Sequence, residues 1–238
     1  MKKIDPRERL IFALDVPDAE AARLMVGNLG DSVVYYKLGL ELAMAGGYFD
    51  LLDWMVGQGK KVFVDLKFFD IPATVAAAVR RLNDRGIGFV TVHGNQGIME
   101  AAAAAAKDVK ILAVTVLTSL DRGDLDDLGF ACDVERLVVS RARRALAAGC
   151  AGVVSSGIEA EAIRAELGDR LLVVTPGIRP VENRPSDDQK RVLTVEGAFA
   201  AGADYIVVGR PIRDAADPRA AAQAIQASIA RVCPAAGA

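Results

Sequence analysis

Short apolar runs rich in branched side chains alternate with longer amphipathic or alanine-rich segments along the chain. The runs have the length of buried strands, and the segments between them have the length and composition of helices. Strands are predicted at Leu10–Leu14, Val33–Lys37, Lys61–Leu66, Phe89–His93, Lys110–Leu117, Gly152–Ser155, Leu171–Thr175 and Tyr205–Val208. Helices are predicted at Ala19–Asn28, Leu40–Val56, Ala73–Asp84, Gly97–Lys107, Val134–Ala148, Glu159–Glu166, Thr194–Ala201 and Arg219–Arg231. The pattern therefore predicts a series of β/α units.

Eight β/α units within 238 residues predict an α/β protein of the (β/α)8 TIM barrel class, with residues 1–238 forming a single catalytic domain. No shift in composition marks a linker. The alternative is a doubly wound open sheet. Its dinucleotide-binding form needs Gly-x-Gly-x-x-Gly after the first strand, where this chain has Asp15-Val16-Pro17-Asp18. We therefore prefer the closed barrel.

The charge balance narrows the range of partners. The chain carries 29 basic and 31 acidic side chains, a formal net charge of −2. Such a balance creates no broad positive field, so we expect no nucleic-acid or membrane partner. No apolar run approaches the roughly 18 residues that a membrane-spanning helix needs. Three cysteines without metal-ligand spacing and a single histidine leave zinc few ligands and indicate a reduced, cytoplasmic protein.

Charged residues interrupt an apolar strand within residues 63–75. Side chains on a strand alternate between its faces, so Asp65 and Lys67 are predicted to point the same way. Asp70 follows in a turn, and Pro72 suits the first position of a helix. Asp65 and Lys67 could form a structural ion pair while Asp70 caps the helix. An ion pair and a helix cap would not require the complete pattern Asp-x-Lys-x-x-Asp-Ile-Pro-x-Thr. The pattern is therefore more specific than a structural role explains.

In a barrel, the carboxyl ends of the strands converge on one site. At the predicted strand ends lie Asp15, Lys37, Asp65, Lys67, His93, Thr118, Gly177-Ile178-Arg179 and Gly209-Arg210. Glycine lets the backbone approach a phosphate closely, and an arginine beside it can donate two hydrogen bonds to the phosphate oxygens. The last two loops therefore predict a phosphate site, although both glycines could be ordinary turn residues. His93 is more simply explained as a structural residue.

These residues resemble the orotidine 5′-phosphate decarboxylases, the family that makes UMP in pyrimidine synthesis. The likeness extends from Leu10 to about Pro218, and its central motif is the segment of residues 65–74. Further motifs follow in the family's order at Ala13–Asp15, Tyr36–Gly39, Val116–Ser119, Thr175–Pro180, Asp188–Arg191 and Val208–Ile212. Gly94–Gly97 and Ser155 depart from the bacterial pattern, but neither belongs to the charged motif.

The resemblance implies that Lys67 is the catalytic lysine and that Lys37, Asp65 and Asp70 complete an alternating charge network. It implies that orotidine 5′-phosphate is bound by Asp15, Lys37, Asp65, Thr74, Thr118, Arg179, Gln189, Gly209 and Arg210. Arg179, Gln189, Gly209 and Arg210 would hold its phosphate side, and UMP would be the product. Family members use no cofactor or metal. They are homodimers in which the residues matching Asp70 and Thr74 reach into the neighbour's site.

The chemistry of such a reaction suits the charged motif. Loss of CO₂ from C6 of the pyrimidine leaves an electron pair in the ring plane, where the π system cannot delocalise it. Stabilisation must then be electrostatic, and a fixed ammonium can both stabilise the carbanion and protonate it. Lys67 fits both roles, with carboxylates beside it to stabilise its charge. The polar segment Pro180–Arg191 contains Gln189 and is predicted to close over the phosphate.

Two other functions fit part of the pattern. Related barrels that share Asp-x-Lys-x-x-Asp act on sugar phosphates with Mg²⁺, and a non-catalytic barrel could bind a phosphorylated ligand. The extension Asp70-Ile71-Pro72-x-Thr74 and Gln189 favour the nucleotide decarboxylase over the first alternative. A binding protein would have no use for Lys67 between two aspartates.

Overall fold

The computed structural model describes residues 2–179 and 193–234. Its strands are β1 (Leu10–Ala13), β2 (Tyr35–Leu38), β3 (Lys61–Phe68), β4 (Ile87–His93), β5 (Lys110–Val114), β6 (Gly152–Val154), β7 (Leu172–Thr175) and β8 (Tyr205–Val208). Each strand pairs in parallel with the next, and β1 pairs with β8 to close the barrel. The predicted (β/α)8 barrel is confirmed.

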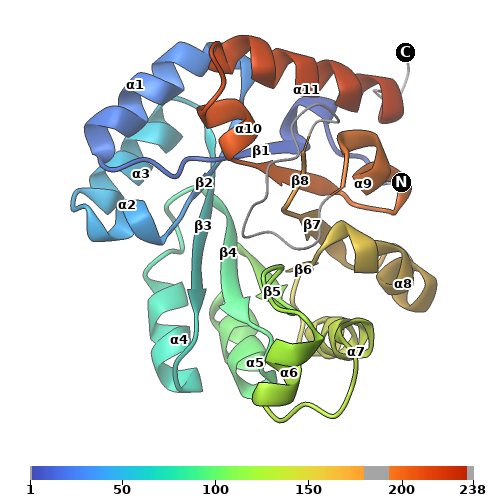
Figure 1. Cartoon of the computed structure of the whole chain (residues 1–238). Coiled ribbons are helices and arrows are strands. Elements are labelled where there is room, and N and C mark those ends of the chain that lie inside the picture. Colours follow the sequence, from blue (N-terminus) through green and yellow to red (C-terminus); the bar gives the residue numbers. More distant parts are fainter. Residues whose placement is uncertain (1, 180–192, 235–238) are drawn as a thin grey trace.

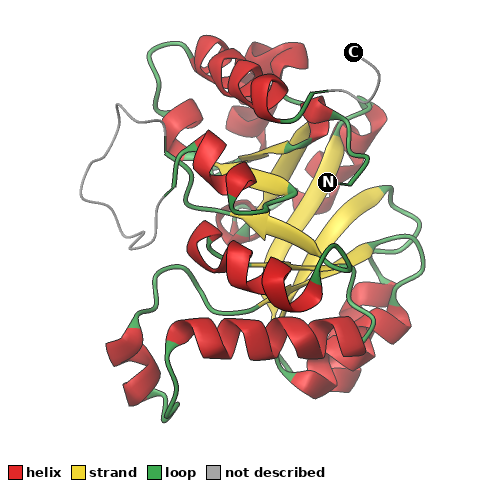
Figure 2. Cartoon of the chain, turned by 90° about the vertical axis from the view of Figure 1, so that its right-hand side faces the viewer, coloured by secondary structure: helices red, strands yellow, loops and turns green. Residues whose placement is uncertain are grey.

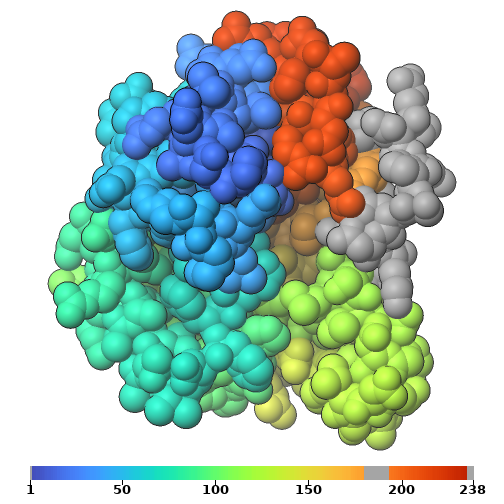
Figure 3. Space-filling view, turned by 60° about the vertical axis from the view of Figure 1, so that its left-hand side comes forward, coloured from blue at the N-terminus to red at the C-terminus, as the bar shows by residue number. Residues whose placement is uncertain are grey.

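Helices surround the barrel on its outside (Figures 1 and 2). They are α1 (Ala19–Leu29), α2 (Leu40–Met44), α3 (Tyr48–Gly57), α4 (Pro72–Arg80), α5 (Gln96–Ala105), α6 (Arg122–Asp127), α7 (Val134–Ala147), α8 (Gly157–Leu167), α9 (Val195–Ala200), α10 (Arg210–Arg213) and α11 (Pro218–Val232), with single 3₁₀ turns at Pro6–Glu8 and Gly30–Ser32. Because the barrel closes, α11 packs beside α1, and the first and last parts of the chain adjoin on the surface (Figure 3). Among the described residues, no helix has the length and apolar character needed to cross a membrane.

Alternation of side chains along the strands divides the core into two layers. In β1, Leu10 and Phe12 belong to the layer between the barrel and the helices, whereas Ile11 and Ala13 point into the barrel. Both layers are apolar because a parallel barrel strand is covered on its two faces. This explains why the strands appear in the sequence as continuous apolar runs.

The barrel interior is filled by aromatic rings. The rings of Tyr35 and Phe89 stack with centroids 5.3 Å apart, and Tyr205 meets the Phe89 ring edge-on at 5.2 Å. Phe63, the partner of Phe89 across the β3–β4 pairing, meets the Phe89 ring edge-on at 5.8 Å. Such offset and edge-to-face contacts add to the stabilisation from burial. The rings form a solid floor, so a ligand can enter only above it, toward the carboxyl ends of the strands.

The prediction of one continuous helix at Leu40–Val56 is wrong, because the structure divides this segment into α2 and α3. Gly46 and Gly47 separate the two helices with φ angles of 83° and 66°, a left-handed backbone that glycine adopts without a steric penalty. The short helices α6 and α10 were not predicted, since each has too few residues for a helical period to appear.

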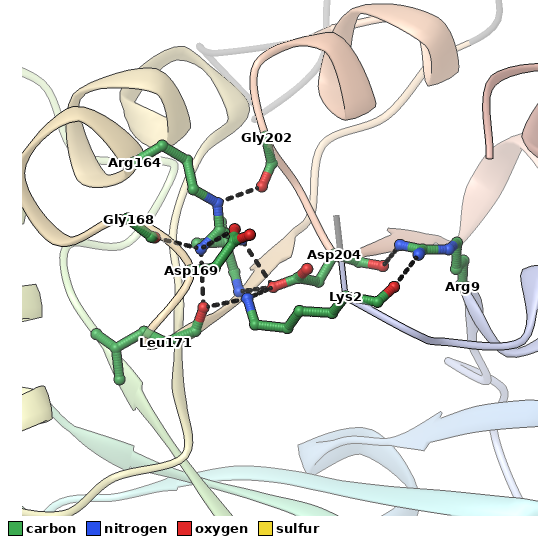
Figure 4. A network of polar contacts seen from close by, with 9 residues as sticks. Lys2, Arg9, Arg164, Gly168, Asp169, Leu171, Gly202 and Asp204 are labelled. Carbon is green, nitrogen blue, oxygen red and sulfur yellow. Dashed lines mark hydrogen bonds and ion pairs between the residues drawn. The ribbon is translucent and has the colours of Figure 1, made fainter. Parts of the chain in front are cut away.

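The start of the chain is fastened across the amino ends of the strands by a buried carboxylate (Figure 4). Asp204 is 3% exposed, and one of its oxygens accepts from Lys2 Nζ at 2.8 Å and from Arg164 Nη2 at 2.7 Å. The same oxygen accepts from the backbone N–H of Val173 at 3.0 Å. Arg9 donates to the carbonyl oxygens of Asp204 and Lys2, both at 3.0 Å. The network therefore joins the N-terminal segment, α8 and β8.

We expect Asp204→Ala to lower the free energy of unfolding by about 3–5 kcal/mol, because the substitution leaves two cations without their buried counter-ion. Asp53→Ala is the matched control. It breaks an ion pair with Arg85 at 2.9 Å in which Asp53 is 55% exposed, and it should cost less than about 1 kcal/mol. Equilibrium urea unfolding measures both. Equal losses in the two variants would show that the Asp204 network does not fasten the fold.

Candidate active site

A cavity of about 450 Å³, here called the mouth cavity, lies above the aromatic floor at the carboxyl ends of the strands. Its apolar base is formed by Ala13, Phe63, Val114, Val154 and Val207. Its polar wall includes Asp15, Lys37, Asp65, Lys67, Thr118, Gly177, Arg179, Gly209, Arg210 and Arg213. Most of the residues predicted for one site are thus brought together by the ends of different strands.

Four charged side chains in the mouth cavity form an alternating series, here called the charge chain: Asp15, Lys37, Asp65 and Lys67. Lys37 Nζ lies 3.2 Å from Oδ1 of Asp15 and 3.5 Å from Oδ2 of Asp65. Lys67 Nζ lies 2.9 Å from the same Asp65 oxygen. Asp65 therefore holds both ammonium groups through one oxygen atom.

Burial and opposite charges act against each other in the charge chain. Burial alone would raise the pKa of Asp65, but the ammonium groups of Lys37 and Lys67 and the hydrogen bonds it accepts hold that pKa below its usual range. Burial alone would lower the pKa of Lys37, but the carboxylates of Asp65 and Asp15 raise it above its usual value. Both groups are therefore charged at neutral pH.

Strand β3 departs from regular pairing at the charged motif. Val64 pairs with Val90, and the next pairing joins Phe68 to Val92, so β3 uses two residues more than β4 over the same distance. Lys67 has a φ of 47°, in the left-handed region that is disfavoured for residues with a side chain. The strand was predicted to end at Leu66, and this irregularity is why the prediction stopped short. Asp65 and Lys67 nevertheless both face the mouth cavity, as predicted.

Asp70 and Thr74 lie away from the mouth cavity of their own chain. Both are exposed, and the Asp70 carboxylate accepts from the N–H of Ile71 at 2.6 Å, just before α4. Asp70 borders a separate shallow depression that includes Phe69 and Ile71, whose side chains are 65% and 66% exposed. A single chain therefore does not bring Asp70 to Lys67.

The loops after β7 and β8 form the side of the mouth cavity predicted to hold phosphate. Gly177 has a φ of 77°, and Arg179 is buried with its guanidinium donating to the carbonyl of Ile178 at 3.3 Å. Gly209 precedes α10, and Arg210 is the first residue of that helix. Gln189 and the predicted lid Pro180–Arg191 lie outside the described residues, so this part of the expectation stays a prediction.

Arg213 was missed by sequence reasoning. Its Nη1 donates to the carbonyl oxygen of Asp15 at 2.9 Å, which ties the loop after β1 to α10. The sequence contained a signal for this residue, because a second arginine follows Arg210 by three residues, one helical turn later. Two arginines thus border the same end of the cavity.

His93 is the last residue of β4 and Thr91 lies two residues before it, and neither lines the mouth cavity. The His93 ring packs on the Phe69 ring with centroids 4.5 Å apart, as the structural interpretation predicted. Burial, together with Arg141 and Lys67, lowers the pKa of this imidazole. Thr91 was missed. The available signal was a hydroxyl side chain within an otherwise apolar strand.

A larger open depression of about 940 Å³ lies between α1, α3 and α11. Three of its four basic side chains donate to main-chain carbonyls: Arg7 to Asp31 at 3.0 Å, Lys60 to Gly30 at 2.7 Å and Arg219 to Asn28 at 2.7 Å. These contacts satisfy the carbonyl end of α1. We therefore place the candidate active site in the smaller mouth cavity, where the charge chain lies.

The described residues contain no group of three or more histidine, cysteine, aspartate or glutamate side chains placed to hold a metal ion. In the mouth cavity, the two carboxylates of the charge chain are each within 3.5 Å of a lysine ammonium. One oxygen of each carboxylate is thus already paired with an ammonium, where a hard cation would need oxygen ligands. That no cofactor is used remains a prediction.

Comparisons with known proteins agree closely with one another. Residues 8–225 match the model of the "Orotidine 5′-phosphate decarboxylase / HUMPS family". A curated orotidine 5′-phosphate decarboxylase from Methylococcus capsulatus is 65% identical over 228 residues, which cover 96% of this chain and 94% of that protein. One from Stenotrophomonas maltophilia is 55% identical over 225 residues, covering 94% and 93%. The crystal structure of orotidine 5′-phosphate decarboxylase from Lactobacillus acidophilus is similar with a TM-score of 0.82 at 34% identity, covering 93% of this chain and 99% of that one.

Proposed function

The chain belongs to the orotidine 5′-phosphate decarboxylase / HUMPS family, and we propose that its charge chain is the apparatus that decarboxylates orotidine 5′-phosphate to UMP. The enzyme is a carboxy-lyase of pyrimidine biosynthesis. One observation carries the proposal for its mechanism. The ammonium of Lys67 lies 2.9 Å from the buried carboxylate of Asp65 at the edge of the mouth cavity. A fixed positive charge is thus available beside the base of a bound nucleotide.

Lys67 supplies the two things that the reaction needs. As CO₂ leaves C6, negative charge develops in the plane of the ring, and a preorganised ammonium stabilises it more than mobile water does. The same ammonium then donates the proton that replaces the carboxylate. Asp65 keeps the ammonium in place and lies beside the position of the departing carboxylate. It also keeps Lys67 paired when no substrate is bound.

Asp15, Lys37 and Thr118 contact the nucleotide farther from C6. The Lys37 side chain is 12% exposed and held between two carboxylates, so its ammonium is fixed and can donate to a ribose hydroxyl. Asp15 is partly exposed at the cavity edge, where a carboxylate can accept from the same sugar. Thr118 lines the cavity after β5 and can donate to or accept from the base. These contacts orient the ring above Lys67.

The phosphate binds at the end of the mouth cavity bordered by the loops after β7 and β8. Gly177 and Gly209 have no side chain to keep the backbone away from an anion, and Arg179 and Arg210 supply positive charge. Gln189 completes this end in the proposal. Binding energy from the unreactive phosphate can contribute to rate when it is realised in the transition state.

A Mg²⁺-dependent reaction on a sugar phosphate is the alternative, and a chelator separates the two. We expect wild-type protein to release CO₂ from orotidine 5′-phosphate in excess EDTA at its full rate, followed by ultraviolet absorbance. Lys67→Ala should lose at least about 10³-fold in kcat, because one side chain supplies both the stabilising charge and the proton. Lys107→Ala, which removes a lysine that is 73% exposed, should leave kcat unchanged.

Binding must be checked in the same series. Lys67→Ala should still bind UMP in a calorimetric titration, since the phosphate contacts lie elsewhere. Inhibition of the wild type by EDTA would contradict the metal-free proposal. A Lys67→Ala enzyme that keeps a hundredth of wild-type kcat or more would contradict the role of Lys67.

We further propose that the enzyme is a homodimer in which Asp70 and Thr74 complete the neighbour's site. Two observations support this. Asp70 and Thr74 are exposed and do not line the mouth cavity of their own chain, and the apolar side chains of Phe69 and Ile71 beside them are also exposed. Covering these side chains with a second chain would bury apolar surface and move Asp70 out of solvent. Each site would then use the charge chain of one subunit and Asp70 of the other.

Mixing two inactive variants tests this arrangement. After subunit exchange, Lys67→Ala and Asp70→Ala chains should recover about a quarter of wild-type activity, because about half the dimers are mixed and each has one intact site. Lys67→Ala mixed with Asp65→Ala is the matched control. Both residues belong to one chain's cavity, so every site keeps a defect and no activity should return. No recovery in the first mixture, with exchange verified, would contradict the shared site.

We also propose that residues 1–238 act as one catalytic domain in the cytoplasm. The free thiols of Cys132, Cys150 and Cys233 support a reducing location.

A further inference from the structure

Thr91 is a fully buried polar residue in the middle of β4, directly beside the charged motif of β3. It lies between Val90 and Val92, whose partners across the sheet are Val64 and Phe68. The three residues between those partners, which include Asp65 and Lys67, are therefore opposite Thr91 alone. A small side chain with a hydrogen-bonding group occupies the point where regular pairing is lost.

The hydroxyl of Thr91 makes two contacts, one to each catalytic group of β3. It donates to Asp65 Oδ1 at 2.8 Å. It accepts from the backbone N–H of Lys67 at 3.0 Å. An ionised carboxylate can only accept, so the single hydroxyl hydrogen goes to Asp65 and a lone pair remains for the N–H of Lys67. The two contacts are thus compatible and make a bridge from carboxylate to backbone.

This bridge determines how Asp65 presents its two oxygens. Oδ1 is taken by Thr91, whereas Oδ2 lies 2.9 Å from Lys67 Nζ and 3.5 Å from Lys37 Nζ. Rotation of the carboxylate would break contacts with all three partners. The Thr91 hydroxyl therefore fixes the plane of the Asp65 carboxylate on the side away from the mouth cavity.

The same bridge holds the backbone of Lys67. A φ of 47° is unfavourable for a lysine and persists only where the surroundings fix it. Ladder pairing with β4 is interrupted at this position, so the Thr91 hydroxyl takes the N–H that a neighbouring strand would otherwise bind. The direction in which the Lys67 side chain leaves the strand depends on that backbone conformation.

We propose that Thr91 is a positioning residue for decarboxylation, whose hydroxyl fixes the Asp65 carboxylate and the Lys67 backbone relative to each other. Thr91 does not line the mouth cavity and acts only through these two residues. The proposal rests on the function proposed above for Lys67. A displacement of about 1 Å in a catalytic group can reduce rate by about 10²-fold, so a buried hydroxyl outside the cavity can affect turnover.

Three substitutions test the proposal. Thr91→Val keeps the side-chain shape but removes both contacts, and it should lower kcat by about 10- to 100-fold with KM changed less than about threefold. Thr91→Ser keeps the hydroxyl and should stay within about threefold of wild-type kcat. Thr115→Val is the matched control, because Thr115 is also fully buried and its hydroxyl donates only to the carbonyl of Val154, at 3.0 Å. It should retain wild-type kcat.

The pH dependence of kcat gives a second readout that a general loss of packing would not change. Thr91 is one of the donors that lower the pKa of Asp65. Without that donor the carboxylate binds a proton at higher pH, so activity should disappear earlier as pH falls. The acid limb of the kcat profile should move to higher pH in Thr91→Val and stay in place in Thr91→Ser and Thr115→Val.

Thermal unfolding of each variant separates positioning from folding. If Thr91→Val does not fold, Thr91→Ala removes the same hydroxyl and carries the same expectation. Wild-type kcat in a folded variant without the hydroxyl would overturn the proposal, as would equal losses in Thr91→Ser and Thr91→Val. A wild-type protein unable to decarboxylate orotidine 5′-phosphate would instead overturn the proposed function, so the two failures are distinguishable.

Discussion

The carboxylate of Asp65 is the group on which the candidate site depends. It is 8% exposed, and a buried carboxylate is stable only when its charge is compensated and its oxygens are hydrogen-bonded. Lys37, Lys67 and Thr91 provide that compensation from three different strand positions. Removing any of them leaves charge or hydrogen-bonding capacity unmatched. The positions of the two ammonium groups, and hence the proposed chemistry, follow from satisfying this one anion.

The barrel makes such an arrangement possible because the contacts that stabilise the fold and the groups proposed to react lie in different parts of it. The aromatic rings of Tyr35, Phe89 and Tyr205 fill the interior, and Asp204 fastens the amino ends of the strands. The carboxyl ends are then free to carry polar groups above a rigid base. At this end β3 leaves regular pairing between Val64 and Phe68 and Lys67 adopts a left-handed backbone, a strain that the surrounding hydrogen bonds must hold.

Sequence reasoning located the eight strands because their continuous apolar runs have the length of buried strands, and strand order then placed Asp15, Lys37, Asp65 and Lys67 at one end of the barrel. It failed where the decisive contact is between residues distant in sequence. One further failure was local, because Gly46 and Gly47 interrupt the segment that was predicted to be a single helix. The role of Thr91 depends on which residue of β3 lies opposite, and register cannot be read from β4 itself. Asp70 is exposed in its own chain, so its placement depends on a second molecule.

The most direct test of this account is the kcat of Asp65→Asn, a substitution that preserves shape but removes the charge that holds both lysines. We expect kcat to fall by at least about 10³-fold, because the amide can neither neutralise the two ammonium groups nor fix Lys67 beside C6. Affinity for UMP should change by less than about tenfold, since the phosphate contacts are retained. An Asp65→Asn enzyme with kcat within about tenfold of wild type would contradict the central role given to this carboxylate.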